Sequence, residues 1–220
     1  MTLQEKLNAL NGKLESELPA EIIAVMGAAT VEIRLSDIQR NALKMGDTAP
    51  LFGLKDMNGE VVNLVDKLFE GPLLISFFRG NWCPYCIEEL RALNRYYSLV
   101  HDAGASIVGI TSQQPRFNQK LAKDEGIQFD LLTDVACKLM KGFGIVYQLP
   151  TAIKRLYGHF GIDLERYNGA SGWHLPLTSR FVIGSDAKIL CAHIDIDYSE
   201  RTEPKHTIDV LLKALRTKRN

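Results

Sequence analysis

The sequence predicts an α/β fold in which a central mixed sheet is flanked by helices and preceded by an N-terminal helical arm. Short apolar runs that suit buried strands alternate with segments of helical periodicity, and the links between them are short. Such alternation implies parallel strands joined by right-handed crossovers. Hairpin signals on both sides of the alternating region add antiparallel strands, so the predicted sheet is mixed.

Length and periodicity divide the chain into an arm and a domain. The 220 residues suit one enlarged domain better than two compact ones. Leucines recur at three- and four-residue steps from Leu3 to Leu18, which predicts an amphipathic helix that Pro19 ends. With further helix over residues 21–39, we expect an arm over residues 1–42 and a domain over residues 43–217. The arm packs either on the domain or on a second copy of the chain, so a homodimer stays open.

The central strand and the helix after it are the clearest elements of the domain. Residues 72–78 are continuously apolar, as expected for a strand buried on both faces. Residues 84–100 have helical periodicity. Glu88 and Glu89 lie near the start of this helix, where the helix dipole favours negative charge. We therefore expect one continuous helix that presents both carboxylates to its positive end.

The rest of the domain repeats the alternation and closes with a hairpin and a helix. Residues 106–111 predict the next strand and residues 114–125 the next helix. Residues 180–183 and 189–196 predict a hairpin, and Pro204 starts the last helix.

Residues 143–177 form a connection that is longer than usual. They contain a predicted helix over 152–160 and a polar turn over 168–172. Connections of this length are often lids or contact surfaces, so we expect a functional role for this segment.

Composition argues against several classes of protein. Lys and Arg together number 26, as do Asp and Glu, so no basic excess favours a nucleic-acid partner. The terminal basic residues Arg216, Lys218 and Arg219 are interpreted as a solvated tail. Apolar runs are too short for a membrane span, and the N-terminus lacks the apolar core of an export signal. We therefore expect a cytoplasmic protein without a membrane partner, whose thiols stay reduced.

Cys83 and Cys86 form a Cys-x-x-Cys pair at a predicted strand-to-helix junction. This spacing places both sulfurs on one helical face, within reach of a disulfide. Free amides at a helix start lower a thiol pKa from about 8.5 towards the range of about 3.5–7.5. Pro84 suits the first helical turn, and Trp82 provides an apolar wall beside the sulfur. The pair therefore predicts thiol–disulfide chemistry.

Other interpretations of the cysteines and histidines are weaker. Zinc requires about four ligands, and the chain has no second close cysteine pair. Cys191 with His193 has poor spacing for such a site, so we expect no metal. Cys137 and Cys191 stand alone among apolar residues and predict packing roles. The histidines that lack a partner pattern are expected at the surface: His101, His159, His174 and His206.

Several segments resemble the peroxiredoxin-like branch of the alkyl hydroperoxide reductase/thiol-specific antioxidant (AhpC/TSA) superfamily. They are FFRGNWCPYCIEELRALN, GDTAPLF, FDLLTDVACKLMKGFGI, RFVIGSDAKI and DIDYSERTEP, which together with the leucine-rich arm cover most of the chain. The resemblance implies a thioredoxin-like fold with extra N-terminal elements. It also implies thiol-dependent peroxide reduction.

Two registers of the motif assign different roles to the two sulfurs. In the peroxiredoxin register, Arg79 replaces a Pro, Cys83 replaces a Thr, and Cys86 takes the peroxidatic position. In the thioredoxin register, Cys83 is the exposed nucleophile and Cys86 the resolving thiol. We expect Cys83 to attack, because Cys86 lies one turn deeper, where desolvation raises a thiol pKa. Thr178 stands where peroxiredoxins have an active-site Arg and thioredoxins a cis-Pro.

The predicted activity is the reduction of hydrogen peroxide or organic hydroperoxides by this cysteine pair, which a cellular dithiol such as thioredoxin restores. No nucleotide or flavin motif is visible, so no cofactor is expected. A protein-disulfide reductase similar to glutaredoxin, and a non-enzymatic redox sensor, use the same residues and remain alternatives. The expected substrate pocket consists of Arg79, Trp82, Pro84, Tyr85 and Thr178.

Overall fold

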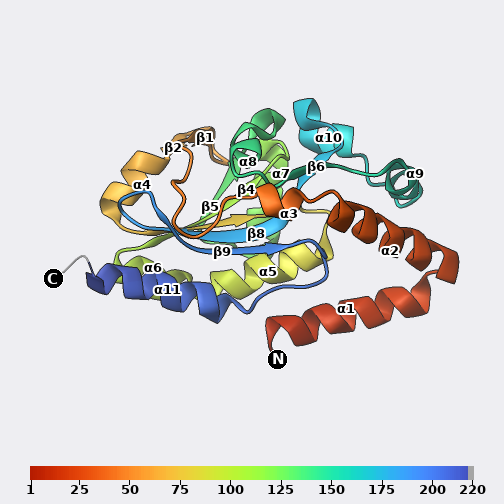
Figure 1. Cartoon of the computed structure of the whole chain (residues 1–220), viewed down its shortest axis with the longest axis horizontal. Helices are drawn as coiled ribbons and strands as arrows, with labels where there is room; N and C mark the ends of the chain where they lie inside the picture. Colours follow the sequence, from red (N-terminus) through yellow and green to blue (C-terminus); the bar gives the residue numbers. More distant parts are fainter. Residues whose placement is uncertain (218–220) are drawn as a thin grey trace.

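A computed structural model describes residues 1–217 of the chain. Its main sheet has seven strands in the order β2-β1-β5-β4-β3-β8-β9 (Figure 1). Their bounds are β1 Gly53–Lys55, β2 Val61–Asn63, β3 Leu73–Phe77, β4 Ser106–Thr111, β5 Asp130–Thr133, β8 Thr178–Ile183 and β9 Ile189–Asp195. Strands β3, β4 and β5 are parallel, and the flanking pairs are antiparallel. The predicted mixed sheet is confirmed.

Helices cover both faces of this sheet. Figure 1 shows α1, α5, α6 and α11 below the strands and α4 and α8 above them. Their bounds are α1 Leu3–Glu17, α4 Leu64–Glu70, α5 Pro84–Asn94, α6 Tyr97–Ala103, α8 Lys138–Gly142 and α11 Pro204–Thr217, and α7 spans Pro115–Glu125. Side chains of a strand alternate between the two faces of a sheet. Leu74 of β3 therefore packs in the core between the sheet and α5, and Ile75 packs in the core between the sheet and α8. All five residues of β3 are buried, as its continuous apolar sequence predicts.

The predicted helix over residues 84–100 is wrong in one respect, because it is two helices. The side-chain Nδ2 of Asn94 donates to the carbonyl oxygen of Gly126 at 2.9 Å, and the side-chain Oδ1 of Asn94 accepts from the backbone N–H of Gln128 at 2.8 Å. These bonds tie the end of α5 to the loop after α7, and α6 starts again at Tyr97. The break therefore depends on residues more than thirty positions away along the chain.

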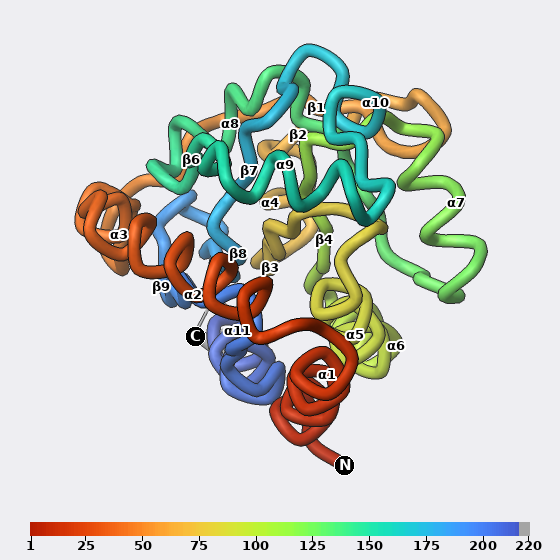
Figure 2. The backbone as a smooth tube through the Cα atoms, turned by 90° about the vertical axis from the view of Figure 1, so that its right-hand side faces the viewer, coloured from red at the N-terminus to blue at the C-terminus, as the bar shows by residue number. Residues whose placement is uncertain are grey.

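The N-terminal arm consists of α1, α2 (Ala20–Leu35) and the short α3 (Ile38–Asn41). Pro19 separates the first two, as predicted, but the expected helix over residues 21–39 is interrupted by Asp37, whose φ of 56° is left-handed. Figure 2 shows α1 beside α5 and α2 along the side of the molecule that carries α9, and both pairs are in contact. The boundary between arm and domain at residue 42 stays a prediction.

The long connection over residues 143–177 contains a small sheet and two helices. Strands β6 (Val146–Gln148) and β7 (His174–Pro176) pair antiparallel, apart from the main sheet. Between them lie α9 (Thr151–His159) and α10 (Leu164–Asn168), with 3-10 turns η1 (Val135–Cys137) and η2 (Gly169–Ser171) nearby. The predicted helix over 152–160 is confirmed as α9.

The basic C-terminal tail lies largely beyond what the structure describes. Lys218 and Arg219 are outside the described residues, as is the side chain of Arg216, so the prediction for the tail is not tested. Within residues 1–217, none of the helices has the length and apolar character that a membrane crossing requires.

Candidate functional site

The two cysteines of the pair lie where the central strand β3 gives way to α5. Cys83 is the N-cap residue of α5, and Pro84 occupies the first helical position as predicted. Both thiols are free, and both residues are buried, with 1% of Cys83 and 0% of Cys86 exposed. The side chains around them therefore enclose both sulfurs almost completely.

A tight turn at Gly80 leads into Cys83. Gly80 has a φ of 156°, and a Cβ there would lie 2.4 Å from Trp82 Nε1 and 3.1 Å from Gln113 Oε1. Gln113 Oε1 also accepts from the backbone N–H of Asn81 at 2.9 Å. Only glycine fits this turn, because any side chain would displace Trp82 or Gln113.

The two thiols have opposite protonation tendencies. Burial alone would raise the pKa of Cys83, but the hydrogen bond from the Cys86 thiol and the positive charge of Arg79 outweigh burial and lower this pKa to about 6. Burial raises the pKa of Cys86, and the hydrogen bond to Cys83 raises it further. These shifts favour the thiolate form at Cys83 and the thiol form at Cys86.

Arg79 is a buried cation without a carboxylate partner among the described residues. It is 5% exposed, and its guanidinium carbon lies 4.9 Å from the ring centre of Trp82 and 4.8 Å from that of Tyr198. It donates a hydrogen bond to the hydroxyl of Tyr157, while its Nε is buried with no partner. Because a buried charge needs a counter-charge, Arg79 favours the thiolate form of Cys83 and lowers the pKa of that thiol.

A cavity of about 140 Å³ opens beside Cys83. Four of the predicted pocket residues, Arg79, Trp82, Pro84 and Tyr85, line it. Thr178, the fifth residue of the predicted pocket, is not among the residues that line this cavity. Thr178 is 2% exposed at the start of β8, opposite Asp195 on β9.

The cavity walls come from four parts of the chain that are distant in sequence. Besides the cysteine motif, they include residues of the arm helices α1 and α2, residues of the segment around α9, and Tyr198, which follows β9. The sequence did not predict that the arm and the α9 segment line one cavity with the cysteine motif.

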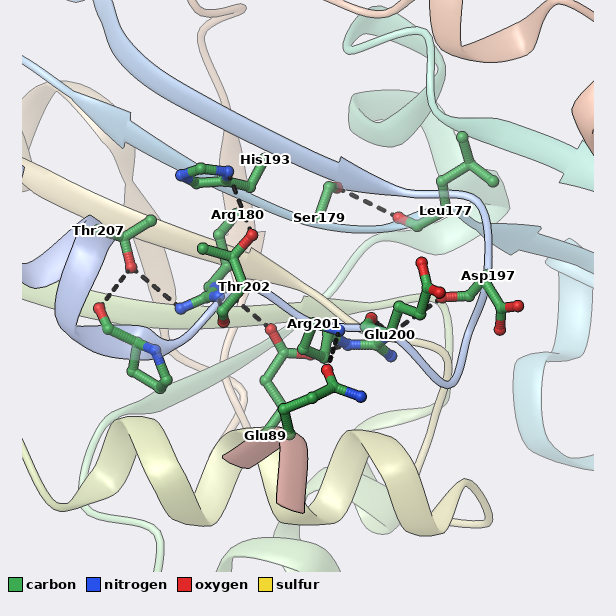
Figure 3. A network of polar contacts seen from close by, with 12 residues as sticks. Glu89, Leu177, Ser179, Arg180, His193, Asp197, Glu200, Arg201, Thr202 and Thr207 are labelled. Atoms are coloured by element: carbon green, nitrogen blue, oxygen red, sulfur yellow. Dashed lines mark hydrogen bonds and ion pairs between the residues drawn. The ribbon is translucent and has the colours of Figure 1, made fainter. Parts of the chain in front are cut away.

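The positive charge of Arg201 acts on Cys86, and Arg201 belongs to a buried cluster with Glu89 and Arg180 (Figure 3). Glu89 Oε1 is 3.2 Å from Arg180 Nε, and Glu89 Oε2 is 2.6 Å from Arg201 Nε. All three side chains are at most 1% exposed.

Further hydrogen bonds hold the two arginines of this cluster. Arg180 donates to Thr207 Oγ1 at 3.1 Å and to the carbonyl oxygen of Thr202, and Arg201 donates to the carbonyl oxygen of Glu200. The dipole role predicted for Glu89 is wrong, because this residue lies beyond the first turn of α5 and pairs with buried arginines. Sequence reasoning missed the cluster, since its only local signal is one Glu among apolar positions.

The remaining cysteines and histidines agree with packing and surface positions. Cys137 is fully buried and Cys191 half-buried, and burial raises the pKa of each. Histidines 101, 159, 174 and 206 are all exposed, as predicted. Among residues 1–217 no group of three or more His, Cys, Asp and Glu side chains is arranged to hold a metal ion.

Comparison with known proteins identifies the family. The sequence model described as the AhpC/TSA family matches residues 45–191. Peroxiredoxin Bcp of Escherichia coli K12 is 34% identical over 106 residues, which are 48% of this chain and 67% of the relative. The thiol-disulfide oxidoreductase ResA of Geobacillus thermodenitrificans is 30% identical over 114 residues, or 51% of this chain and 64% of ResA.

A solved structure shows the same fold. Peroxidoxin BcpB of Mycobacterium tuberculosis superposes with a TM-score of 0.62 at 24% identity, covering 81% of this chain and 99% of BcpB. At this identity the likeness concerns the fold alone, which agrees with the mixed sheet and its flanking helices. The chain is therefore a peroxiredoxin-like member of the AhpC/TSA family with a thioredoxin-like fold.

Proposed function

We propose that this protein is a thiol-dependent peroxidase in which Cys83 attacks the peroxide and Cys86 resolves the product. The carrying observation is that Cys83, whose pKa is lowered to about 6, lines the cavity together with Arg79. Cys86 is fully buried, has a raised pKa and is not among the cavity residues. This assignment follows the thioredoxin register of the motif and departs from the peroxiredoxin register.

The reaction follows from these positions. The Cys83 thiolate attacks one oxygen of the hydroperoxide, the O–O bond breaks, and the second oxygen leaves with the peroxide proton as an alcohol or as water. Cys83 is thereby oxidised to a sulfenate, which takes up one proton from solvent to become a sulfenic acid. The Cys86 thiol then forms the S–S bond, and its proton leaves with the sulfenic oxygen as water.

Arg79 fits the charge changes of this sequence. Its guanidinium balances the thiolate before attack, and its unpartnered Nε can donate to a peroxide oxygen beside the sulfur. An external dithiol such as thioredoxin then reduces the disulfide by exchange through a mixed disulfide, and we place this cycle in the cytoplasm. The homodimer stays a prediction that sedimentation of the purified chain would test.

The test compares peroxide consumption with the reduction of insulin disulfides, for wild type and for Cys83→Ser and Cys86→Ser. We expect wild type to turn over peroxide faster than insulin. Cys83→Ser should lose both activities, whereas Cys86→Ser should accumulate a dimedone-reactive sulfenic acid at Cys83. A sulfenic acid trapped at Cys86 in Cys83→Ser, at near wild-type rate, would contradict the assignment.

A second candidate function is protein-disulfide reduction, which the similarity to ResA and the Cys-x-x-Cys spacing of Cys83 and Cys86 favour. Insulin turnover that exceeds peroxide turnover would support it. A single oxidation per chain without turnover of either substrate would instead indicate the redox sensor.

A further inference from the structure

The N-terminal arm forms one wall of the cavity beside Cys83. Leu14 from α1 and Met26, Ala29 and Ile33 from α2 line it. Tyr85 of the cysteine motif also donates from its hydroxyl to Asn11 Oδ1 of α1 at 2.6 Å, which ties the arm to the motif. All of these arm residues precede residue 45, where the match to the AhpC/TSA family begins. The arm therefore adds a wall that the family-matched part of the chain does not supply.

The opposite wall is also apolar. Leu149, Ile153 and Phe160, from α9 and the residues that flank it, also line the cavity. The polar groups of the lining residues are few: the Cys83 thiol, the Arg79 guanidinium, the Thr30 hydroxyl, the Trp82 indole N–H and the hydroxyls of tyrosines. A largely apolar pocket with a few polar groups suits a ligand that has an apolar body and one polar end.

The size of the cavity limits that body. Its volume is about 140 Å³, close to the roughly 150 Å³ of a dry engineered cavity that binds benzene. The space therefore accommodates about one ring or a compact branched alkyl group. Hydrogen peroxide has no apolar body, so it gains nothing from these walls.

We propose that the arm makes this site selective for organic hydroperoxides with a compact apolar body, such as an aryl or tertiary alkyl group. The hydroperoxide end would meet Cys83 and Arg79, and the apolar body would lie between α2 and the α9 segment. This inference rests on the proposed peroxidase function and names its substrate class. The specificity-determining residues are those of the arm, with Ala29 as the smallest of them.

The test uses two neighbouring alanines of α2. Ala29 is 7% exposed and lines the cavity, whereas Ala28 is exposed to solvent. Ala29→Leu should reduce the ratio of kcat/KM for cumene hydroperoxide to kcat/KM for hydrogen peroxide by about tenfold, the scale of a misfitted group in an apolar pocket. Ala28→Leu should leave both values unchanged. Because both substrates are measured on one preparation, a loss of folded protein cannot change the ratio.

A binding measurement separates this inference from the proposed function. Cumyl alcohol, the inert product, should quench or shift the fluorescence of Trp82 in a Trp173→Phe background, and it should bind about tenfold more weakly to the Ala29→Leu variant. An unchanged substrate ratio in Ala29→Leu, or no binding of cumyl alcohol to the resting protein, would overturn the selectivity. Binding without peroxide turnover would instead contradict the peroxidase function and leave the apolar site standing.

Discussion

The two sides of the cysteine pair both contain buried arginines, but they differ in how the positive charge is balanced. On the Cys86 side, Arg180 and Arg201 share the carboxylate of Glu89 and donate further bonds to the chain around them. On the Cys83 side, Arg79 has no carboxylate partner among the described residues; it donates to the Tyr157 hydroxyl and lines the cavity. A compensated arginine holds structure together, whereas an uncompensated one beside a thiol is available for chemistry.

The largest effect should come from breaking the compensated side. Glu89→Gln leaves two buried guanidinium groups without their counter-charge, so we expect a loss of about 3–5 kcal/mol in the free energy of unfolding. Urea denaturation measures this loss. The matched control is Glu88→Gln, because Glu88 pairs with Lys6 and Arg91 nearer the surface and should cost less than about 1 kcal/mol. Equal losses in the two variants would show that the buried cluster carries no special weight.

The uncompensated side should be visible in the pH dependence of alkylation. Because the Cys86 thiol and Arg79 favour the thiolate and lower the pKa of Cys83 to about 6, its thiolate fraction should be half-maximal near pH 6 and level off above pH 7. At pH 7 the thiolate fraction should be about thirtyfold higher than for a thiol with a pKa of about 8.5. Mass spectrometry of iodoacetamide-treated peptides resolves Cys83 from the other cysteines. A midpoint near pH 8.5 would contradict the contrast between the two sides.

Removal of the uncompensated charge should have a smaller effect. Arg79→Met deletes the cation that favours the Cys83 thiolate, so the pKa of Cys83 should rise by about one unit and peroxide reactivity near pH 6 should fall about fivefold. The loss should shrink as the pH rises, because the thiolate then forms without help. Arg79→Lys keeps the charge and should recover part of the reactivity. A loss of equal size at every pH would show that Arg79 acts through packing or through contact with the peroxide, and not by stabilising the thiolate.

Sequence pattern was sufficient where the signal is local. The continuous apolar run before Gly80 identified β3, and the strand–helix alternation identified the sheet. The spacing of Cys83 and Cys86 predicted their place at a helix start, where the structure has Cys83 as the N-cap of α5, because the N-terminal end of a helix is a local feature. Pattern was insufficient where partners are distant. The break between α5 and α6 depends on bonds from Asn94 to the loop after α7, and these cannot be predicted from the helix itself.

The site shows the same limit. Glu89 has an ordinary place in an amphipathic helix until the fold brings Arg180 and Arg201 to it. Thr178 was predicted in the pocket from its position in a motif, yet burial against the next strand keeps it away from the cavity lining. The wall formed by α2 was not predicted, because the periodicity of a helix shows which face is apolar and not what that face covers.

The smallest effect should come from the two cysteines that lie outside both sides of the pair. Cys137 packs in the core above the sheet and Cys191 lies half-buried on the edge strand β9, and burial raises the pKa of each. Thiols that stay protonated react slowly with peroxide, so the double variant Cys137→Ala/Cys191→Ala should keep peroxide turnover within a few-fold of wild type. The lost sulfur atoms should cost about 1 kcal/mol of stability, which urea denaturation measures. If turnover collapses while the variant remains folded, one of these two cysteines is the resolving thiol and the role of Cys86 must be reassigned.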